Sequence, residues 1–192
     1  MMNRWFSKHS SIFFLLIFFS CQSEYEKLEK RELSSGKKVD ELFLGLKLGM
    51  EKRDFFQTCW DLNKEGLLTN GPTELSVEYS PEMPSGNAAK MRFYPKFLED
   101  KIYLMPIEFQ YESWAPWNEE LSVDKLREDV LKLMEEWYGP GFIEVSNEDE
   151  SKIVYVKMDG NRRIRIFKKS LSAVRVEISD LPVQKMLSEK ES

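Results

Sequence analysis

The first 20 residues of this chain have the pattern of a segment that is removed before the protein folds. Arg4 and Lys8 place positive charge ahead of an unbroken apolar run, 12–19, which Ser20 closes. Positive charge, a short apolar run and a small residue, in that order, are typical of a secretory signal peptide. The run of eight residues is too short for a transmembrane helix, which needs about 20. We therefore predict that 1–20 is an export signal and that the remaining 172 residues are the mature chain.

A cysteine follows the small residue, and Ser20-Cys21 at the end of the apolar run resembles the lipobox of bacterial lipoproteins. The resemblance implies that 1–20 is a lipoprotein signal peptide, cleaved before Cys21, and that acyl chains such as palmitate are attached to the thiol and the new amino terminus. Gln22 stands where an Asp retains lipoproteins at the inner membrane, which by the same analogy implies the outer membrane, facing the periplasm. The alternative is a plain signal peptide with an incidental cysteine.

The segment 21–41 is dominated by Glu, Lys, Ser and Arg. So few apolar side chains cannot offset the entropy lost on ordering the chain. We predict a flexible tether that holds the domain about 25 Å from the lipid headgroups. Its sizeable apolar residues are Tyr25, Leu28, Leu33 and Val39.

Composition excludes several kinds of site. The one histidine, His9, lies in the export signal, so the exported protein has no imidazole for a catalytic triad or for metal binding. With Cys21 modified, Cys59 is the remaining thiol, which excludes an internal disulfide and a cysteine-ligated zinc site. We therefore predict no cofactor and no metal.

Charge argues against a nucleic-acid partner. Removing Arg4 and Lys8 from the 28 basic residues leaves 26 against 33 acidic ones, a net charge of −7. A mildly acidic protein is poorly suited to binding a polyanion. The glycine spacing of a phosphate-binding loop is also missing from the sequence.

The exported chain shows a helix followed by strands, twice. We predict an α+β domain over 42–180, built from two α-β-β-β halves, 42–113 and 119–180. Their helices are expected to pack on one face of an antiparallel sheet, and 181–192 is expected to be a C-terminal tail. The predicted strands are 75–79, 90–94, 102–112, 153–158, 162–168 and 173–179.

Two helices are predicted. In the first, 51–67, an i, i+3, i+4, i+7 stripe is expected to face the core: Phe56, Cys59, Trp60 and Asn63, with Phe55 and Leu62 widening it. The second begins after Ser122 as N-cap and ends at Gly139. Its expected core face is Leu126, Val130, Leu133, Met134 and Trp137. Its expected solvated face is Lys125, Glu128, Asp129 and Lys132.

Two details of the strands are also predicted. Pro106 cannot donate a ladder hydrogen bond, so it indicates an edge position or a bulge. A three-residue loop, 159–161, would pair 156 with 164 and gather Val154, Val156 and Met158 on the face of Ile164 and Ile166. A two-residue turn, 159–160, would instead pair 156 with 163.

Two short motifs carry a family resemblance. Gly45-Leu46-Lys47-Leu48-Gly49-Met50-Glu51-Lys52 resembles the segment that opens the first helix of small outer-membrane-assembly lipoproteins and of β-lactamase-inhibitor-like domains. Trp137-Tyr138-Gly139-Pro140 is similar to the end of a helix in the same domains. The resemblance implies a binding module with helices on one face of an antiparallel sheet.

Three groups of side chains are candidates for function. Arg163 and Arg165, with Lys157 and Arg175, could bind an anionic partner or form a solvated sheet face. The carboxylates Glu99, Asp100, Glu108 and Glu112 could serve a glycosidase or lie on a strand and a turn. Trp114 and Trp117 could form an aromatic platform, with Trp114 the more exposed ring, or plug the junction of the halves.

From these observations we expect a lipid-anchored protein of the bacterial cell envelope that is not an enzyme. It is predicted to be a binding or assembly accessory module with a protein or glycan partner in the envelope. Its candidate contact residues are Trp114, Trp117, Arg163 and Arg165, and its lipid attachment site is Cys21. The alternative is a carboxylate-based hydrolase acting on cell wall or glycan.

Overall fold

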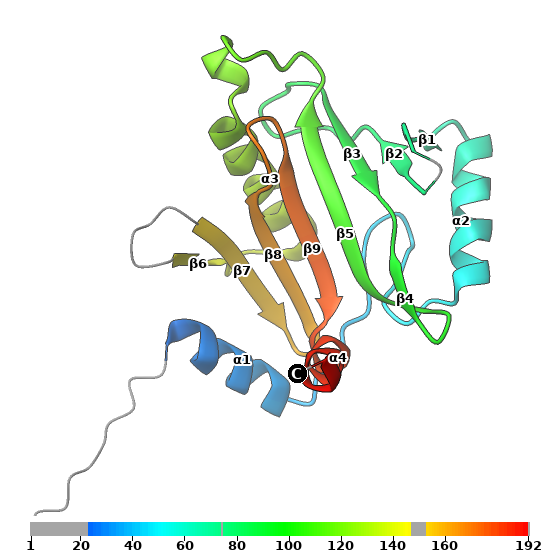
Figure 1. The fold of residues 1–192 in the computed structure, drawn as a ribbon, viewed down its shortest axis with the longest axis vertical. Coiled ribbons are helices and arrows are strands. Elements are labelled where there is room, and N and C mark those ends of the chain that lie inside the picture. Colours follow the sequence, from blue (N-terminus) through cyan, green and yellow to red (C-terminus); the bar gives the residue numbers. More distant parts are fainter. Residues whose placement is uncertain (1–22, 74, 147–152, 192) are drawn as a thin grey trace, which may run out of the picture.

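The computed structural model describes residues 23–73, 75–146 and 153–191. Cys21 and the predicted export signal lie outside this range. Within it, four α-helices pack against one antiparallel sheet of nine strands, which confirms the predicted α+β class (Figure 1). The helices are α1 Glu24–Ser34, α2 Lys52–Lys64, α3 Val123–Tyr138 and α4 Leu181–Glu191, with a 3-10 turn at Glu119–Leu121.

The sheet runs in the order β1-β2-β3-β5-β9-β8-β7-β6, and β4 pairs with the first part of β5. The long strand β5 and the last strand β9 are neighbours at its centre. The nine strands are β1 Thr69–Asn70, β2 Val77–Tyr79, β3 Ala89–Phe93, β4 Lys96–Leu98, β5 Lys101–Tyr111, β6 Ile143–Ser146, β7 Ile153–Asp159, β8 Arg162–Lys168 and β9 Val174–Asp180.

The main core lies between α3 and the middle of the sheet. Val130 and Met134 of α3 are fully buried in one cluster with Ile164 of β8 and Val176 of β9. The Ser122 side chain accepts a hydrogen bond from the backbone N–H of Lys125, so the predicted N-cap is confirmed. The long apolar stripe of this helix therefore fixes it across the sheet.

The predicted register of the β7–β8 hairpin is wrong. Val156 pairs with Arg165, and Asp159 pairs with Arg162, so the loop is the two residues Gly160-Asn161. Val156 therefore lies on the face opposite Ile164, because neighbouring residues of a strand point to opposite sides. Both faces of this hairpin carry apolar side chains, so the apolar residues of β7 and β8 do not gather on one face and the loop is one residue shorter than predicted.

Helix α1 covers the second apolar face. Leu28 of α1 is buried in a small separate cluster with Val156 and Met158 of β7 and Leu181 of α4. Arg163 donates a hydrogen bond from Nη1 to the Tyr25 hydroxyl at 2.7 Å. The helices thus do not all lie on one face of the sheet, and the segment predicted as a flexible tether is partly a docked helix.

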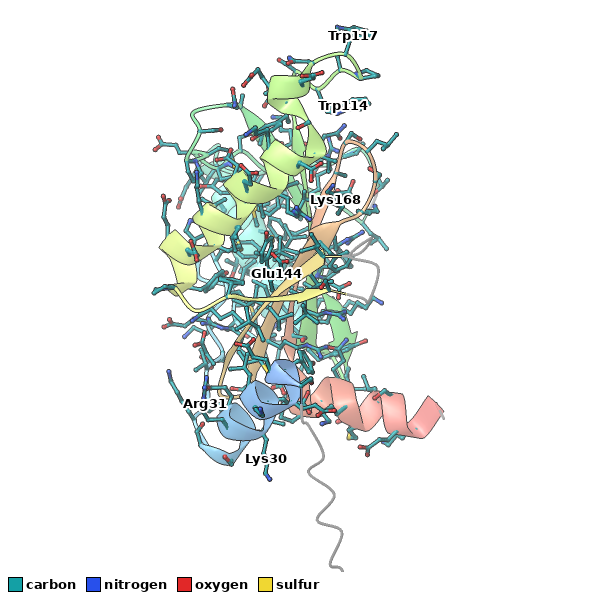
Figure 2. The ribbon with its side chains drawn as sticks, turned by 90° about the vertical axis from the view of Figure 1, so that its left-hand side faces the viewer. Lys30, Arg31, Trp114, Trp117, Glu144 and Lys168 are labelled. Carbon is teal, nitrogen blue, oxygen red and sulfur yellow. The ribbon has the colours of Figure 1, made fainter. Side chains whose placement is uncertain are left out.

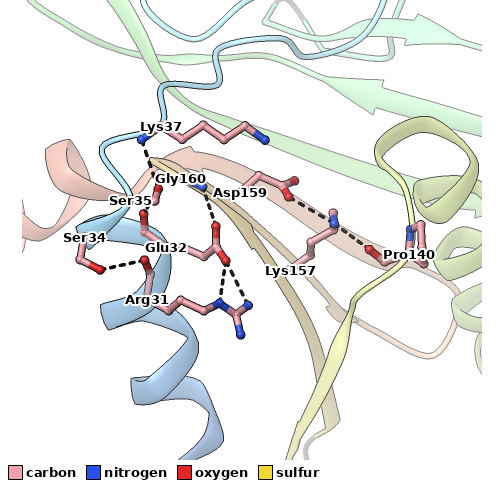
Figure 3. Close-up of polar contacts among 9 residues, drawn as sticks. All are labelled: Arg31, Glu32, Ser34, Ser35, Lys37, Pro140, Lys157, Asp159 and Gly160. Carbon is pink, nitrogen blue, oxygen red and sulfur yellow. Dashed lines mark hydrogen bonds and ion pairs between the residues drawn. The ribbon is translucent and has the colours of Figure 1, made fainter.

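The chain after α1 is held by the hairpin turn. The backbone N–H of Gly160 donates to the Glu32 carboxylate at 3.2 Å (Figure 3), and that of Val39 donates to Asn161 Oδ1 at 2.6 Å. A Cβ at Gly160 would lie 2.0 Å from the backbone oxygen of Lys37, so only glycine permits this close crossing.

The end of the chain is also ordered where a tail was predicted. Leu181, the first residue of α4, is buried, and Gln184 accepts a hydrogen bond from Arg163 Nη2 at 2.7 Å. Lys185 of α4 forms an ion pair with Glu29 of α1. The two terminal helices therefore meet at one end of the molecule, as Figure 1 shows.

Pro106 lies in a central strand, so the edge position we predicted is wrong, whereas a bulge, the alternative, has a counterpart in the register shift of the β4–β5 pairing between Lys96 and Phe97. It pairs with Glu177 of β9 on one side. On the other side β3 pairs with β5 only as far as Ile107, and the β4 pairing begins at Leu104. Pro106 thus faces the gap between β3 and β4, where its missing N–H costs no ladder hydrogen bond.

Candidate functional site

Helix α2 presents aromatic side chains to solvent. Phe55 is fully buried, whereas Phe56 is 47% exposed and Trp60 is 60% exposed. The prediction that Phe56 and Trp60 face the core is therefore wrong. The other part of the predicted stripe is confirmed: Phe55 is buried in the core, and Cys59 and Leu62 are half-buried against it.

A groove of about 250 Å³ lies between this exposed face and the nearby edge of the sheet. Helix α2 forms one wall, and the short strands β1 and β2 with Tyr94 form the other, beside α2 in Figure 1. The lining residues are Phe55, Phe56, Cys59, Trp60, Asn63, Leu68, Thr69, Asn70, Ser76, Val77 and Tyr94.

The aromatic side chains of the groove, which come from both of its walls, contact one another. The rings of Phe55 and Tyr94 are perpendicular, with centroids 5.9 Å apart, and Phe97 meets Tyr94 at 6.3 Å. Phe56 lies 6.5 Å from Tyr94 across the groove. Because Phe55 is buried and its ring contacts that of Tyr94, the Tyr94 ring is held in one position. These aromatic side chains are therefore ordered before a ligand binds.

The polar groups of the groove are neutral at physiological pH. Burial raises the pKa of the Cys59 thiol to about 11, so this side chain is an uncharged and poorly reactive thiol. Asn63 donates a hydrogen bond from Nδ2 to the backbone oxygen of Leu68 at 2.7 Å, which fixes the turn after α2. At the rim, Lys64 Nζ lies 5.4 Å from the centroid of the Trp60 ring.

A second hollow, of about 330 Å³, lies near the end of α3. Its described lining is Leu42, Phe43, Leu44, Tyr79 and Trp137, so its polar side-chain groups are the Tyr79 hydroxyl and the Trp137 indole N–H. The groove beside α2 combines aromatic faces with several neutral polar groups, which is the composition typical of a specific binding site.

The two-tryptophan loop places its rings differently from our prediction. Trp117 is 85% exposed, whereas Trp114 is half-buried and packs against the main core. The expectation that Trp114 is the more exposed ring is therefore wrong. Both residues lie at the end of the molecule opposite α1, as Figure 2 shows.

This placement predicts unequal effects of removing the two rings. We expect Trp117→Ala to change the free energy of unfolding by less than about 0.5 kcal/mol, because an exposed side chain loses little packing. Trp114→Ala is expected to destabilise the protein by about 1–3 kcal/mol, since its ring contributes to the core. Urea unfolding of both variants measures the difference, and an equal loss would contradict the placement of the rings.

The predicted basic cluster is split and paired. Arg163 donates to Tyr25 and Gln184, and Arg165 forms an ion pair with Glu177. These two arginines share the face of the sheet opposite α3 with Arg175, whereas Lys157 points to the other face. Binding of an anionic partner at Arg163 and Arg165 stays a prediction, although both side chains already hold parts of the fold together.

The predicted carboxylates are not gathered into one site. Glu108 forms ion pairs with Lys169 and Arg175, and Glu112 pairs with Lys90. Glu99 and Asp100 form the β4–β5 turn, with φ angles of 48° and 60°. No observation brings two of these carboxylates together in a cavity, so none favours the hydrolase alternative.

Asp129 is a buried residue that sequence reasoning assigned to the solvated face of α3. It is 4% exposed and accepts hydrogen bonds from the backbone N–H of Ser85 and from the Tyr111 hydroxyl, at 2.8 and 3.0 Å. Its position beside Val130 and one turn after Leu126, two residues of the core face, is the sequence feature that indicates burial of Asp129. Asp129 thus fastens the loop between β2 and β3 to the core.

A cluster of charged side chains, the half-buried Asp159 with the buried Lys157 and Arg162, joins three segments. Asp159 lies 3.3 Å from Lys157 Nζ and 3.0 Å from Arg162 Nη2, and both cations are buried. Lys157 also donates to the backbone oxygen of Pro140 (Figure 3), and Arg162 donates to that of Glu41, both at 2.7 Å. Each bond ties the β7–β8 hairpin to a neighbouring loop, which gives this cluster a structural role.

Among the described residues, no three His, Cys, Asp or Glu side chains lie close enough to hold a metal ion. Across the ranges 23–73, 75–146 and 153–191, no helix has both the length and the apolar character needed to cross a bilayer. Comparison of the chain with protein-family models, with curated proteins and with solved structures finds no match.

Proposed function

We propose that this protein is a lipid-anchored, non-catalytic binding module of the bacterial cell envelope, held at the outer membrane on the periplasmic side. The observation that carries the binding role is the groove beside α2. Exposed Phe and Trp side chains around a hollow are costly to leave in water, and they are enriched at sites of binding. Because Phe55 and the neighbouring rings fix the wall, binding would cost little additional ordering.

The anchor would hold this module close to the membrane. Glu24, the first residue of α1, follows the lipid-attachment site Cys21 by three positions, which allows a reach of about 10 Å. With α1 docked on the sheet, the α1–α4 end faces the bilayer. Trp117 then points away from it, and the groove opens to the side.

The fold also has two halves with the same order of elements, a helix followed by strands. Helix α2 precedes five strands, β1 to β5, and helix α3 precedes four, β6 to β9, so the prediction of three strands in each half is wrong. The last strands of the two sets, β5 and β9, pair at the centre. We infer a pair of related α-then-β halves, and we keep the resemblance to small outer-membrane-assembly lipoproteins and β-lactamase-inhibitor-like domains as part of this proposal.

Removing the acylated thiol tests the anchor. We expect Cys21→Ser to move the protein from the membrane fraction to the soluble periplasmic fraction, because one or more acyl chains supply its membrane affinity. The thermal unfolding temperature is expected to stay unchanged, since the fold begins after this residue. Membrane fractionation of the variant, with Cys59→Ser as the matched control, gives the answer, and an unchanged membrane location would contradict the proposal.

Photo-crosslinking in cells tests the binding role. A photoreactive phenylalanine analogue at position 60 is expected to give a discrete adduct, because this position lies in the groove. Leu171 is 82% exposed but lies outside the groove, so the same analogue at 171 is the control. Absence of any adduct at 60, or equal labelling at both positions, would count against the groove as a binding site.

A further inference from the structure

We propose that the ligand of the groove beside α2 is a neutral glycan, with one sugar ring stacked against Trp60. This inference rests on the proposed binding function and names the chemistry of the ligand. It follows from three properties of the groove: the charge of its lining, the free polar groups within it, and its size.

Among the described residues, the lining carries no charged side chain, and the cation at its rim is Lys64, 5.4 Å from the centroid of the Trp60 ring. All 11 lining residues are aromatic, aliphatic, hydroxyl, amide or thiol in type, and burial keeps the thiol of Cys59 protonated. An ionic group placed inside the groove would lose hydration without a partner of opposite charge among the described lining residues, and Lys64 offers its charge only at the rim. The groove therefore favours an uncharged ligand, although 32% of the chain is charged.

The lining also offers neutral hydrogen-bonding groups that the fold does not use. Among the described residues, the side chains of Thr69, Asn70 and Ser76 form no hydrogen bond, and all three line the groove. They carry two hydroxyls and one amide; Thr69 and Asn70 are neighbours in β1, so their side chains point to opposite faces of that strand and only one of the two can face the groove. A sugar ring has a C–H face that packs on an aromatic ring and a rim of hydroxyls, so it matches both walls at once.

The size of the groove sets the extent of the contact. A cavity of about 150 Å³ holds a six-membered ring such as benzene. The groove, of about 250 Å³, therefore accommodates one sugar ring with its hydroxyls. Because the groove is open to solvent beside Trp60, which is 60% exposed, the rest of a glycan chain can continue outside it.

A peptide fits these walls less well. Addition of an extended peptide to a sheet needs a strand edge of several residues, and β1, at this edge, has only two, Thr69–Asn70. Two residues offer a length of about 7 Å. A protein partner is therefore the competing outcome that the experiment must distinguish.

The test is a titration of the full mature lipoprotein, purified in a detergent without a sugar headgroup. The probes are the neutral tetrasaccharides of N-acetylglucosamine, maltose type and cellulose type, with tetragalacturonate as the charged control. We expect at least one neutral probe to bind with a Kd below about 1 mM by calorimetry. Trp60→Ala and Asn70→Ala are each expected to weaken that binding at least tenfold, and Trp117→Ala to leave it unchanged.

Thermal unfolding of each variant shows whether it is folded, and both groove substitutions are at exposed positions. The glycan proposal is overturned if no neutral probe binds at 10-fold the expected Kd, if tetragalacturonate binds more tightly, or if Trp60→Ala has no effect. If a protein is crosslinked at position 60 while every sugar fails to bind, the binding function stands and the glycan assignment does not. If no sugar binds and no protein is crosslinked at position 60, the glycan assignment and the binding function are both contradicted.

Discussion

Replacing Phe55 by alanine is expected to lower the free energy of unfolding by about 3–5 kcal/mol, the range for a fully buried aromatic ring. Phe55 is fully buried and contacts the rings of Phe56, Tyr94 and Phe97. Phe56→Ala is the matched control, because the same side chain is lost one position along the helix. Its expected cost is less than about 1.5 kcal/mol, since Phe56 is 47% exposed.

Urea unfolding of the two variants, with equal m-values, measures this difference. The comparison matters for function because it decides which face of α2 meets the core. If Phe56→Ala were the more costly change, the aromatic stripe of Phe56 and Trp60 would be core. The groove would then not exist as described.

The second large effect is expected at the buried ionic cluster. Asp159→Ala leaves Lys157 and Arg162 buried without their shared counter-ion, and breaking a buried ion pair in this way costs about 3–5 kcal/mol. Asp124→Ala is the control: Asp124 contacts Arg127 and Lys168, but its side chain is 55% exposed. Exposed ion pairs contribute at most about 1 kcal/mol.

Both variants can be compared by urea unfolding in low and high salt. The loss in Asp159→Ala is expected to persist in high salt, because buried charges are poorly screened, whereas any loss in Asp124→Ala should shrink. Equal costs at both sites would contradict the role given to Asp159 in joining the β7–β8 hairpin to its neighbouring loops.

The parts of the fold that sequence predicts well carry one unambiguous signal. Helix α3 has a single long apolar stripe between a Ser122 cap and Gly139, so its limits and its core face could be read directly. The strands β8 and β9 alternate apolar and polar residues over seven positions each, and their positions were predicted within one residue. The class of fold follows from these elements.

The errors in the core face of α2 and in the β7–β8 register share one physical cause, which is that each element has two apolar faces. Helix α2 carries two parallel stripes, beginning at Phe55 and Phe56, and a short helix at the sheet edge buries only one of them. In the same way β7 is apolar on both faces because α1 covers the second. A local pattern gives no information about a partner that lies 120 residues away in the sequence.

Helix α1 was missed because its composition is that of a disordered segment. Its capping box joins Ser23 and Glu26, and one buried residue, Leu28, anchors it to β7. Most of its stability therefore comes from tertiary contacts such as the Tyr25–Arg163 hydrogen bond, which no local propensity reveals. The groove was missed for a related reason, since its two walls come from separate segments.

The measurement that tests the central claim most directly is hydroxyl-radical footprinting of the protein in intact cells and after purification. If the groove beside α2 is the binding site, oxidation of Phe56 and Trp60 is expected to fall several-fold in cells. Trp117 and Leu171, which are exposed elsewhere, should be oxidised equally in both states. Equal oxidation of Trp60 in both states, or protection of Trp117 alone, would contradict the account.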